Sequence, residues 1–140
     1  MKVTHTIYIG IALLGMAGPA AAETIPRDYD FQQLKRGGQL FQQNCAVCHG
    51  KNAEGTKDWK KTDADGKYPP PPLNGSAHAW HHPTKILVDV IKNGTIRIGG
   101  NMPPWKDKLN DDQIKDIIIW FQSKWSDEIY SAWYEIDQRK

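Results

Sequence analysis

Cys45-Ala46-Val47-Cys48-His49 is the most specific motif of the chain, and the other segments are interpreted around it. Cys-x-x-Cys-His is the pattern typical of c-type haem attachment. Two thiols at this spacing can add across the two vinyl groups of one haem, and the adjacent imidazole then lies under the iron as its proximal ligand. The motif therefore predicts one haem c, bound covalently through Cys45 and Cys48, with His49 as an iron ligand.

Three other interpretations of the two cysteines are weaker. A thioredoxin-like redox pair belongs to a strand–helix alternation, and the sequence does not show one. A zinc site needs a second pair of ligands, but the chain contains only two cysteines. A simple disulfide between Cys45 and Cys48 would leave the adjacent His49 unexplained. Haem attachment uses all three residues and is the preferred interpretation.

Length and composition set wide limits on the function. The chain has 140 residues, which corresponds to one small domain. It carries 18 basic and 16 acidic residues, so no nucleic-acid partner is expected. Both cysteines belong to the haem motif, so no disulfide framework remains to stabilise the fold.

The N-terminus has the features of a signal peptide. Lys2 is followed by an apolar run of 12 residues, 7–18, and by three alanines that end at Ala22. A bilayer span takes about 20 residues, so the run is too short to cross a membrane. We expect residues 1–22 to be removed after Ala22, with an uncleaved anchor as the alternative. The haem motif suits export, since in the systems that it resembles the thioethers form outside the bacterial inner membrane.

Cleavage would leave a periplasmic chain of residues 23–140. The removed segment contains one basic residue, Lys2, so the mature chain would carry 17 basic and 16 acidic residues. No stable membrane insertion is expected after cleavage.

A helix is predicted to carry the haem motif at its C-terminal end. Asp30 is a suitable N-cap, with Gln33 three residues later as in a capping box. Two adjacent glycines, Gly37 and Gly38, cost about 1 kcal/mol each within a helix and indicate close approach by another element. Apolar or small residues then alternate three and four residues apart, as on one face of a helix: Phe31, Leu34, Gly38, Phe41, Cys45 and Cys48.

Three further helices are predicted, and no strand is convincing. Residues 83–94 begin with a proline and end at a glycine, as helices often do. Residues 110–125 begin at Asn110, with Gln113 three residues later, again as in a capping box. A short helix after Ser126, in an extension of about 126–140, is expected to cover the edge of the core. The apolar stripes of the first two are Ile86, Leu87, Val90 and Ile91, and Ile114, Ile117, Ile118, Phe121 and Trp125.

The segments between these helices, 50–82 and 95–109, show little periodicity. Irregular segments of this length are unusual in a compact domain. A haem accounts for them, because loops can pack against the macrocycle. The fold class predicted from the residues is therefore all-α, with helices and long loops around one haem.

Met102 is the strongest candidate for the sixth iron ligand. Met1 and Met16 lie in the expected signal peptide, so Met102 would be the one thioether of the mature chain. Glycines precede it and Pro103-Pro104 stiffen the segment after it. A histidine ligand or an open coordination position remains an alternative; the candidate histidines are His78, His81 and His82.

The same three histidines raise a separate possibility. His78-x-x-His81-His82 is a hypothesis for a small copper or zinc site. The spacing is common and no cysteine or carboxylate completes the set. Surface histidines in the loop before a helix are the preferred interpretation.

Over nearly all of the mature chain, the sequence resembles the class I cytochrome c family of bacterial periplasmic, monohaem proteins. The resemblance is carried by the haem motif, by Gly37 and Phe41 in the first helix, and by Pro71-Pro72-Leu73-Asn74-Gly75, which is similar to the Pro-x-Leu-x-Gly stretch of that family. It implies the small cytochrome c fold, in which Gly37 and Phe41 pack against the last helix at Ile117 and Trp120.

The resemblance also implies roles for two site residues. The carbonyl of Pro71 would accept a hydrogen bond from Nδ1 of His49 and thereby fix the orientation of the ring. Met102 matches the axial methionine of the family. Two segments depart from its pattern: residues 57–67 resemble an insertion, and the tail after Trp125 extends beyond the usual last helix.

The function implied by the resemblance is single-electron transfer, not catalysis. The expected partners are redox proteins that bind transiently, and the chain would be a monomer or a small subunit of a redox complex. Two alternatives stay open at this point. One is a haem enzyme, gas-binding protein or sensor in which Met102 is displaced. The other is a metal-binding module that uses His78, His81 and His82.

Overall fold

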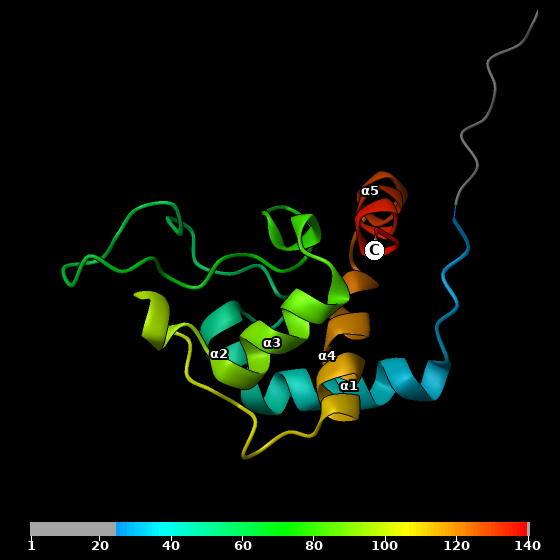
Figure 1. Cartoon of the computed structure of the whole chain (residues 1–140), viewed down its shortest axis with the longest axis horizontal. Coiled ribbons are helices and arrows are strands. Elements are labelled where there is room, and N and C mark those ends of the chain that lie inside the picture. Colours follow the sequence, from blue (N-terminus) through cyan, green and yellow to red (C-terminus); the bar gives the residue numbers. More distant parts are fainter. Residues whose placement is uncertain (1–24, 140) are drawn as a thin grey trace, which may run out of the picture.

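The computed structural model describes residues 25–139 of the chain (Figure 1). Within this range the chain is helical and contains no strand, so the all-α prediction is confirmed there. No helix in the described range is long and apolar enough to cross a membrane. The expected signal peptide, residues 1–22, lies outside the described residues.

Five α-helices and two single turns of 3₁₀-helix make up the regular structure of the described range. The long segments between them follow the irregular stretches expected from the sequence. The α-helices are α1 (Phe31–Asn44), α2 (Ala46–His49), α3 (Thr84–Asn93), α4 (Asp111–Gln122) and α5 (Asp127–Asp137), and the 3₁₀ turns are η1 (Ala79–His81) and η2 (Ile96–Ile98).

The first helix is shorter than predicted. It ends at Asn44, and Cys45 (φ −114°, ψ −33°) separates it from α2. Its predicted apolar face is also partly wrong, because Phe31 is 72% exposed. The buried residues of α1 are Gly37, Phe41 and Asn44. Gly37 and Phe41 lie against α4, at Asp116 and Trp120, whereas Phe31 is in the first turn of α1 and stays uncovered.

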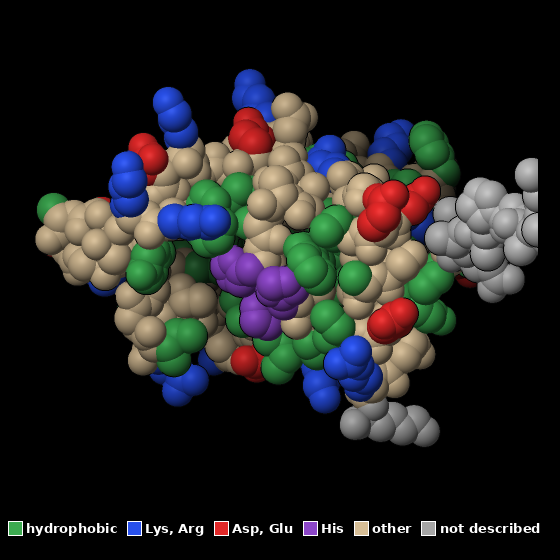
Figure 2. All heavy atoms as spheres, turned by 90° about the horizontal axis from the view of Figure 1, so that it is seen from above, with side chains coloured by type: hydrophobic (Ala, Val, Ile, Leu, Met, Phe, Trp, Pro, Cys, Tyr) green, Lys and Arg blue, Asp and Glu red, His purple; other side chains and the backbone are tan. Residues whose placement is uncertain are grey.

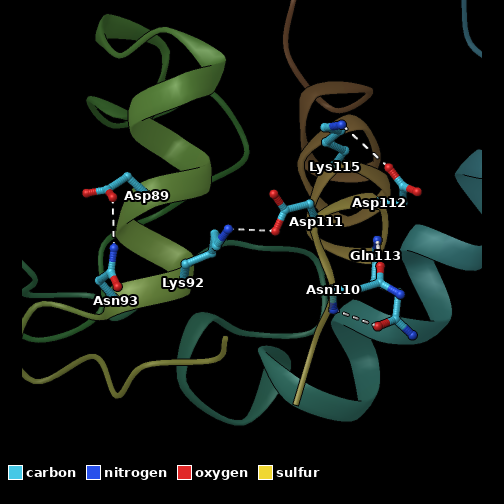
Figure 3. Close-up of polar contacts among 8 residues, drawn as sticks. All are labelled: Asp89, Lys92, Asn93, Asn110, Asp111, Asp112, Gln113 and Lys115. Carbon is cyan, nitrogen blue, oxygen red and sulfur yellow. Dashed lines mark hydrogen bonds and ion pairs between the residues drawn. The ribbon is translucent and has the colours of Figure 1, made fainter. Parts of the chain in front are cut away.

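The boundaries of the later helices were predicted more closely. Asn110 and Gln113 form the reciprocal capping box at the start of α4, with N–O distances of 2.9 and 3.0 Å (Figure 3). The helix ends at Gln122, three residues earlier than predicted, yet Trp125 is buried as expected. The reason is a turn in which the N–H of Trp125 donates to the carbonyl of Gln122 at 3.0 Å.

Helix α3 packs on α4 through fewer residues than predicted. Leu87 and Ile91 are buried, but Ile86 is 40% exposed because it points away from this narrow contact. At the edge of the contact Lys92 pairs with Asp111 at 2.7 Å (Figure 3). Gly94 ends α3 with a φ of +66°, as its position after the apolar stripe predicts.

The crossing of α1 and α4 forms the centre of the core (Figure 1). Gly37 lies against the backbone of α4, and a Cβ there would overlap the carbonyl oxygen of Asp116. Beside it the rings of Phe41 and Trp120 pack with their centroids 4.4 Å apart. Ile117 is 1% exposed at the same crossing. The helix packing implied by the family resemblance is therefore confirmed.

Gly37→Ala is expected to destabilise the protein. Overpacking costs typically about 1–3 kcal/mol, and here the obstacle is rigid backbone, so the cost should exceed the roughly 1 kcal/mol gained in helix propensity. We expect a net loss of about 2 kcal/mol in urea unfolding of the haem-loaded protein. Gln39→Ala, on the exposed side of α1, is the control and should stay within about 0.5 kcal/mol of wild type. Equal stability of the two variants would argue against close backbone approach at Gly37.

Helix α5 covers the edge of the core, as predicted. Ser126 caps it by accepting from the N–H of Ile129 at 3.3 Å, and Tyr130 and Trp133 are buried. A carboxylate oxygen of Asp137 accepts from the N–H of Thr84 at 2.6 Å. The last turn of α5 thus supplies the N-terminal cap that Pro83 cannot give to α3.

Candidate haem-binding site

His49 is held in one orientation from behind. Its Nδ1 lies 2.9 Å from the carbonyl oxygen of Pro71. A carbonyl oxygen can only accept, so Nδ1 carries the proton and Nε2 keeps a lone pair for a metal ion. Burial lowers the pKa of His49, and the bond to Pro71 opposes this in part. The ring is therefore neutral near pH 7, as iron ligation requires.

Cys45 lies at the break between α1 and α2, and Cys48 lies within α2. The carbonyl of Cys45 accepts from the N–H groups of Cys48 and His49 at 3.1 and 2.9 Å, so the three residues share one tight turn. Burial, and secondarily Cys48, raises the pKa of the Cys45 thiol to about 11. A thioredoxin-like nucleophile has a lowered thiol pKa, so this environment argues against that interpretation.

The loop behind His49 is pinned by backbone hydrogen bonds. The N–H of Gly55 donates to the carbonyl of His49 at 2.7 Å, and the N–H of Leu73 donates to the carbonyl of Ala53 at 2.8 Å. Ala53 adopts a φ of +59°, a conformation unusual for a residue with a side chain, and is fully buried. These contacts hold Pro71 in place beside the imidazole.

Met102 is fixed through its backbone by the end of α3. Its N–H donates to Oγ1 of Thr95 at 3.0 Å, and its carbonyl accepts from the N–H of Thr95 at 2.8 Å. Gly94 lies so close that a Cβ there would press on the same carbonyl group. Further along, the N–H of Trp105 donates to the carbonyl of Ile91 at 3.1 Å. The half-buried Met102 side chain packs against the core.

Sequence reasoning missed two of these supporting residues. Thr95 is needed for its hydroxyl, and Ala53 for a carbonyl in a left-handed turn. The position of Thr95 directly after the glycine that ends α3 was the available signal. No local pattern marks Ala53, because its partner Leu73 is distant in the sequence.

The three histidines form an aromatic cluster on one face (Figure 2). The ring of His78 stacks on the ring of Trp59, with the centroids 5.4 Å apart. It lies edge-on to the ring of His82, with the centroids 5.8 Å apart. His81 packs against Trp80 at 3.8 Å. Among residues 25–139 no group of three His, Cys, Asp or Glu side chains is arranged to hold a metal ion. The copper or zinc hypothesis therefore finds no support in the described residues.

The donors that these segments supply fit a haem c. They are two thiols in one turn that form no disulfide, a neutral imidazole with a free Nε2, and a thioether whose backbone is held in place. Soft sulfur and imidazole donors suit iron in a haem. Two exposed apolar side chains on η2, close in sequence to Met102, suit the face of a macrocycle; they are Ile96 (56% exposed) and Ile98 (78%).

Known proteins are similar to the part of the chain that contains the haem motif. Residues 32–121 match the family model described as cytochrome c oxidase, cbb3-type, subunit III. The chain is 33% identical over 92 residues to the cbb3-type cytochrome c oxidase subunit FixP of Azorhizobium caulinodans, covering 65% of this chain and 27% of that subunit. It thus spans about a quarter of the length of the oxidase subunits that it matches.

A small cytochrome and a solved structure are also similar. Cytochrome c6 of Leptolyngbya boryana is 31% identical over 93 residues, covering 63% of this chain and 88% of that protein. The crystal structure of cytochrome CL from Methylophaga aminisulfidivorans has a TM-score of 0.52 and 24% identity, covering 79% of this chain and 68% of that one, and supports the fold. Since the family model spans more than half of the chain and includes the haem motif, the chain belongs to the cytochrome c family as a monohaem c-type cytochrome.

Proposed function

We propose that this cytochrome is a periplasmic single-electron carrier whose iron is ligated by His49 and Met102. The proposal rests on one observation: hydrogen bonds from neighbouring residues hold both His49 and Met102 in place. The carbonyl of Pro71 holds His49, and Thr95 holds both backbone groups of Met102. Donors held in this way keep their positions when the charge on a bound iron changes, and this suits electron transfer.

The proposed ligands determine how strongly the ferric and the ferrous states of the iron are favoured. Bound through Cys45 and Cys48, the haem supplies one-electron oxidation and reduction at its iron. The Nδ1–H bond to Pro71 makes the imidazole of His49 a stronger electron donor, which favours the ferric state. The thioether of Met102 favours the ferrous state and raises the reduction potential. If His49 and Met102 both ligate the iron, the chain leaves no place for a substrate to bind at the metal.

The proposed partners are redox proteins that bind weakly and briefly. Electron-transfer encounters have small interfaces, and the mature chain, with 17 basic and 16 acidic residues, is nearly neutral. Similarity to cytochrome c6 supports a free carrier, whereas similarity to FixP supports a place within an oxidase complex. The proposed periplasmic location rests on the signal-peptide features of residues 1–22 and on the chemistry of haem attachment.

Absorption spectra of both redox states, with and without carbon monoxide, test the proposal. We expect the ferric protein to show the charge-transfer band of methionine ligation, and the native ferrous protein to leave carbon monoxide unbound. Carbon monoxide binding under native conditions would overturn the carrier assignment. It would favour the alternative of a haem enzyme or gas-binding sensor in which Met102 is displaced.

A further inference from the structure

Trp125 is hydrogen-bonded to the loop that supports His49. Its side chain is almost completely buried, and its Nε1–H donates to the carbonyl of Leu73 at 2.8 Å. The same ring covers Gly75, where an added Cβ would lie 3.1 Å from the indole. A residue 52 positions further along the chain therefore holds the end of the Pro71–Leu73 segment.

The backbone between Leu73 and His49 has little freedom to absorb a displacement. The N–H of Leu73 is bonded to Ala53, and Pro72 is buried. The ring of Pro72 locks its own φ, and a proline at this position also restricts the ψ of Pro71. The direction of the Pro71 carbonyl, which accepts from His49, thus depends on where Leu73 is held.

The C-terminal extension fixes Trp125 in turn. The ring of Trp125 packs against the ring of Trp133 in α5, with the two centroids 5.9 Å apart. Its carbonyl accepts from Arg27 at 2.8 Å, and Arg27 also pairs with Asp127 at 2.8 Å. The extension, which departs from the pattern of the family, is therefore linked through Trp125 to the loop that supports His49.

We infer that Trp125 is a positioning residue for the proximal ligand, acting through Leu73 and Pro71 on the Nδ1–H bond of His49. This inference rests on the proposed function. Loss of the indole donor lets the Pro71 carbonyl move and lengthens its bond to His49. The imidazole then donates less electron density, the ferric state is less favoured, and the reduction potential rises.

Trp125→Phe in the full-length, haem-loaded protein is the test, because it removes the N–H donor and keeps an aromatic ring. We expect the ratio of reduced to oxidised protein against a fixed mediator couple to rise about threefold. This is less than the roughly 10- to 100-fold losses of metal affinity or activity that follow when a direct hydrogen-bond partner of a metal ligand is removed. The proton resonance of His49 Nδ1 should shift in the direction of a weaker hydrogen bond.

Trp133→Phe is the matched control. Trp133 is also buried and touches Trp125, but its Nε1 donates to no protein acceptor among residues 25–139. Both substitutions should lower the stability, whereas only Trp125→Phe should raise the potential. An unchanged potential in Trp125→Phe, or equal shifts in both variants, would overturn the inference.

Two further measurements cover the remaining cases. If Trp125→Phe does not fold, hydrogen exchange of the Trp125 indole N–H in the wild-type protein tests whether the bond to Leu73 exists. Slow exchange supports the bond to Leu73, and exchange as fast as that of an exposed indole contradicts it. The charge-transfer band should persist in Trp125→Phe. Its absence from the wild type would count against methionine ligation, a failure of the proposed function that is distinguishable from failure of this inference.

Discussion

Met102→Ala is expected to abolish the ferric charge-transfer band and to let the ferrous protein bind carbon monoxide. The substitution removes the one thioether of residues 23–140 and leaves the Thr95 contacts to the backbone intact. Axial ligands set haem potentials over a range of about 0.8 V. Because the thioether favours ferrous iron, its loss should lower the reduction potential by on the order of 100 mV. Absorption spectroscopy and a redox titration measure both effects.

His82→Ala is the control for the sixth ligand. His82 belongs to the histidine cluster that was the alternative source of a ligand, and its ring lies edge-on to His78. We expect this variant to keep both the band and the wild-type potential. If His82→Ala loses the ligand signature and Met102→Ala keeps it, ligation by two histidines replaces the proposal.

The double variant Cys45→Ala/Cys48→Ala is expected to be largely unfolded. It can form no thioether, so the haem is not retained as part of the core. The helices are too short to compensate, since α2 has 4 residues and α1 has 14, and isolated helices below about 12–15 residues are marginal in water. Circular dichroism should show most of the helical signal lost and no cooperative transition in urea.

Val47→Ala is the matched control for the double variant. Val47 lies between the two cysteines and is 89% exposed, so its side chain supports neither the core nor the thioethers. This variant should incorporate haem and unfold cooperatively. A stable, cooperatively folded double-alanine chain without haem would contradict the view that haem attachment completes the core.

The sequence predicted those parts of the fold that depend on local patterns. The capping box of Asn110 and Gln113 and the buried stripe of α4 were identified because caps and helical faces involve residues three or four positions apart. The exposure of Phe31 was missed, although it fits the same spacing. The length of the crossing between α1 and α4 decides which turns of α1 are covered, and periodicity contains no information about that length.

Cleavage of the signal peptide and the identity of the iron ligands are predicted from the sequence. Residues 1–22 lie outside the described range, so cleavage after Ala22 stays a prediction. Ligation by His49 and Met102 also stays a prediction, supported by the contacts that hold the two residues. Covalent haem c, in contrast, follows from membership of the cytochrome c family together with Cys45 and Cys48.

The donor chemistry of this cytochrome is encoded in the sequence alone, because thiol, imidazole and thioether are properties of residue identity. How firmly each donor is held is decided by the tertiary structure. Thr95 holds Met102, Asp137 caps α3, and Trp125 reaches Leu73 only because the folded path brings them together. These are hydrogen bonds between residues separated by 7, 53 and 52 positions, and no local periodicity or capping pattern specifies them.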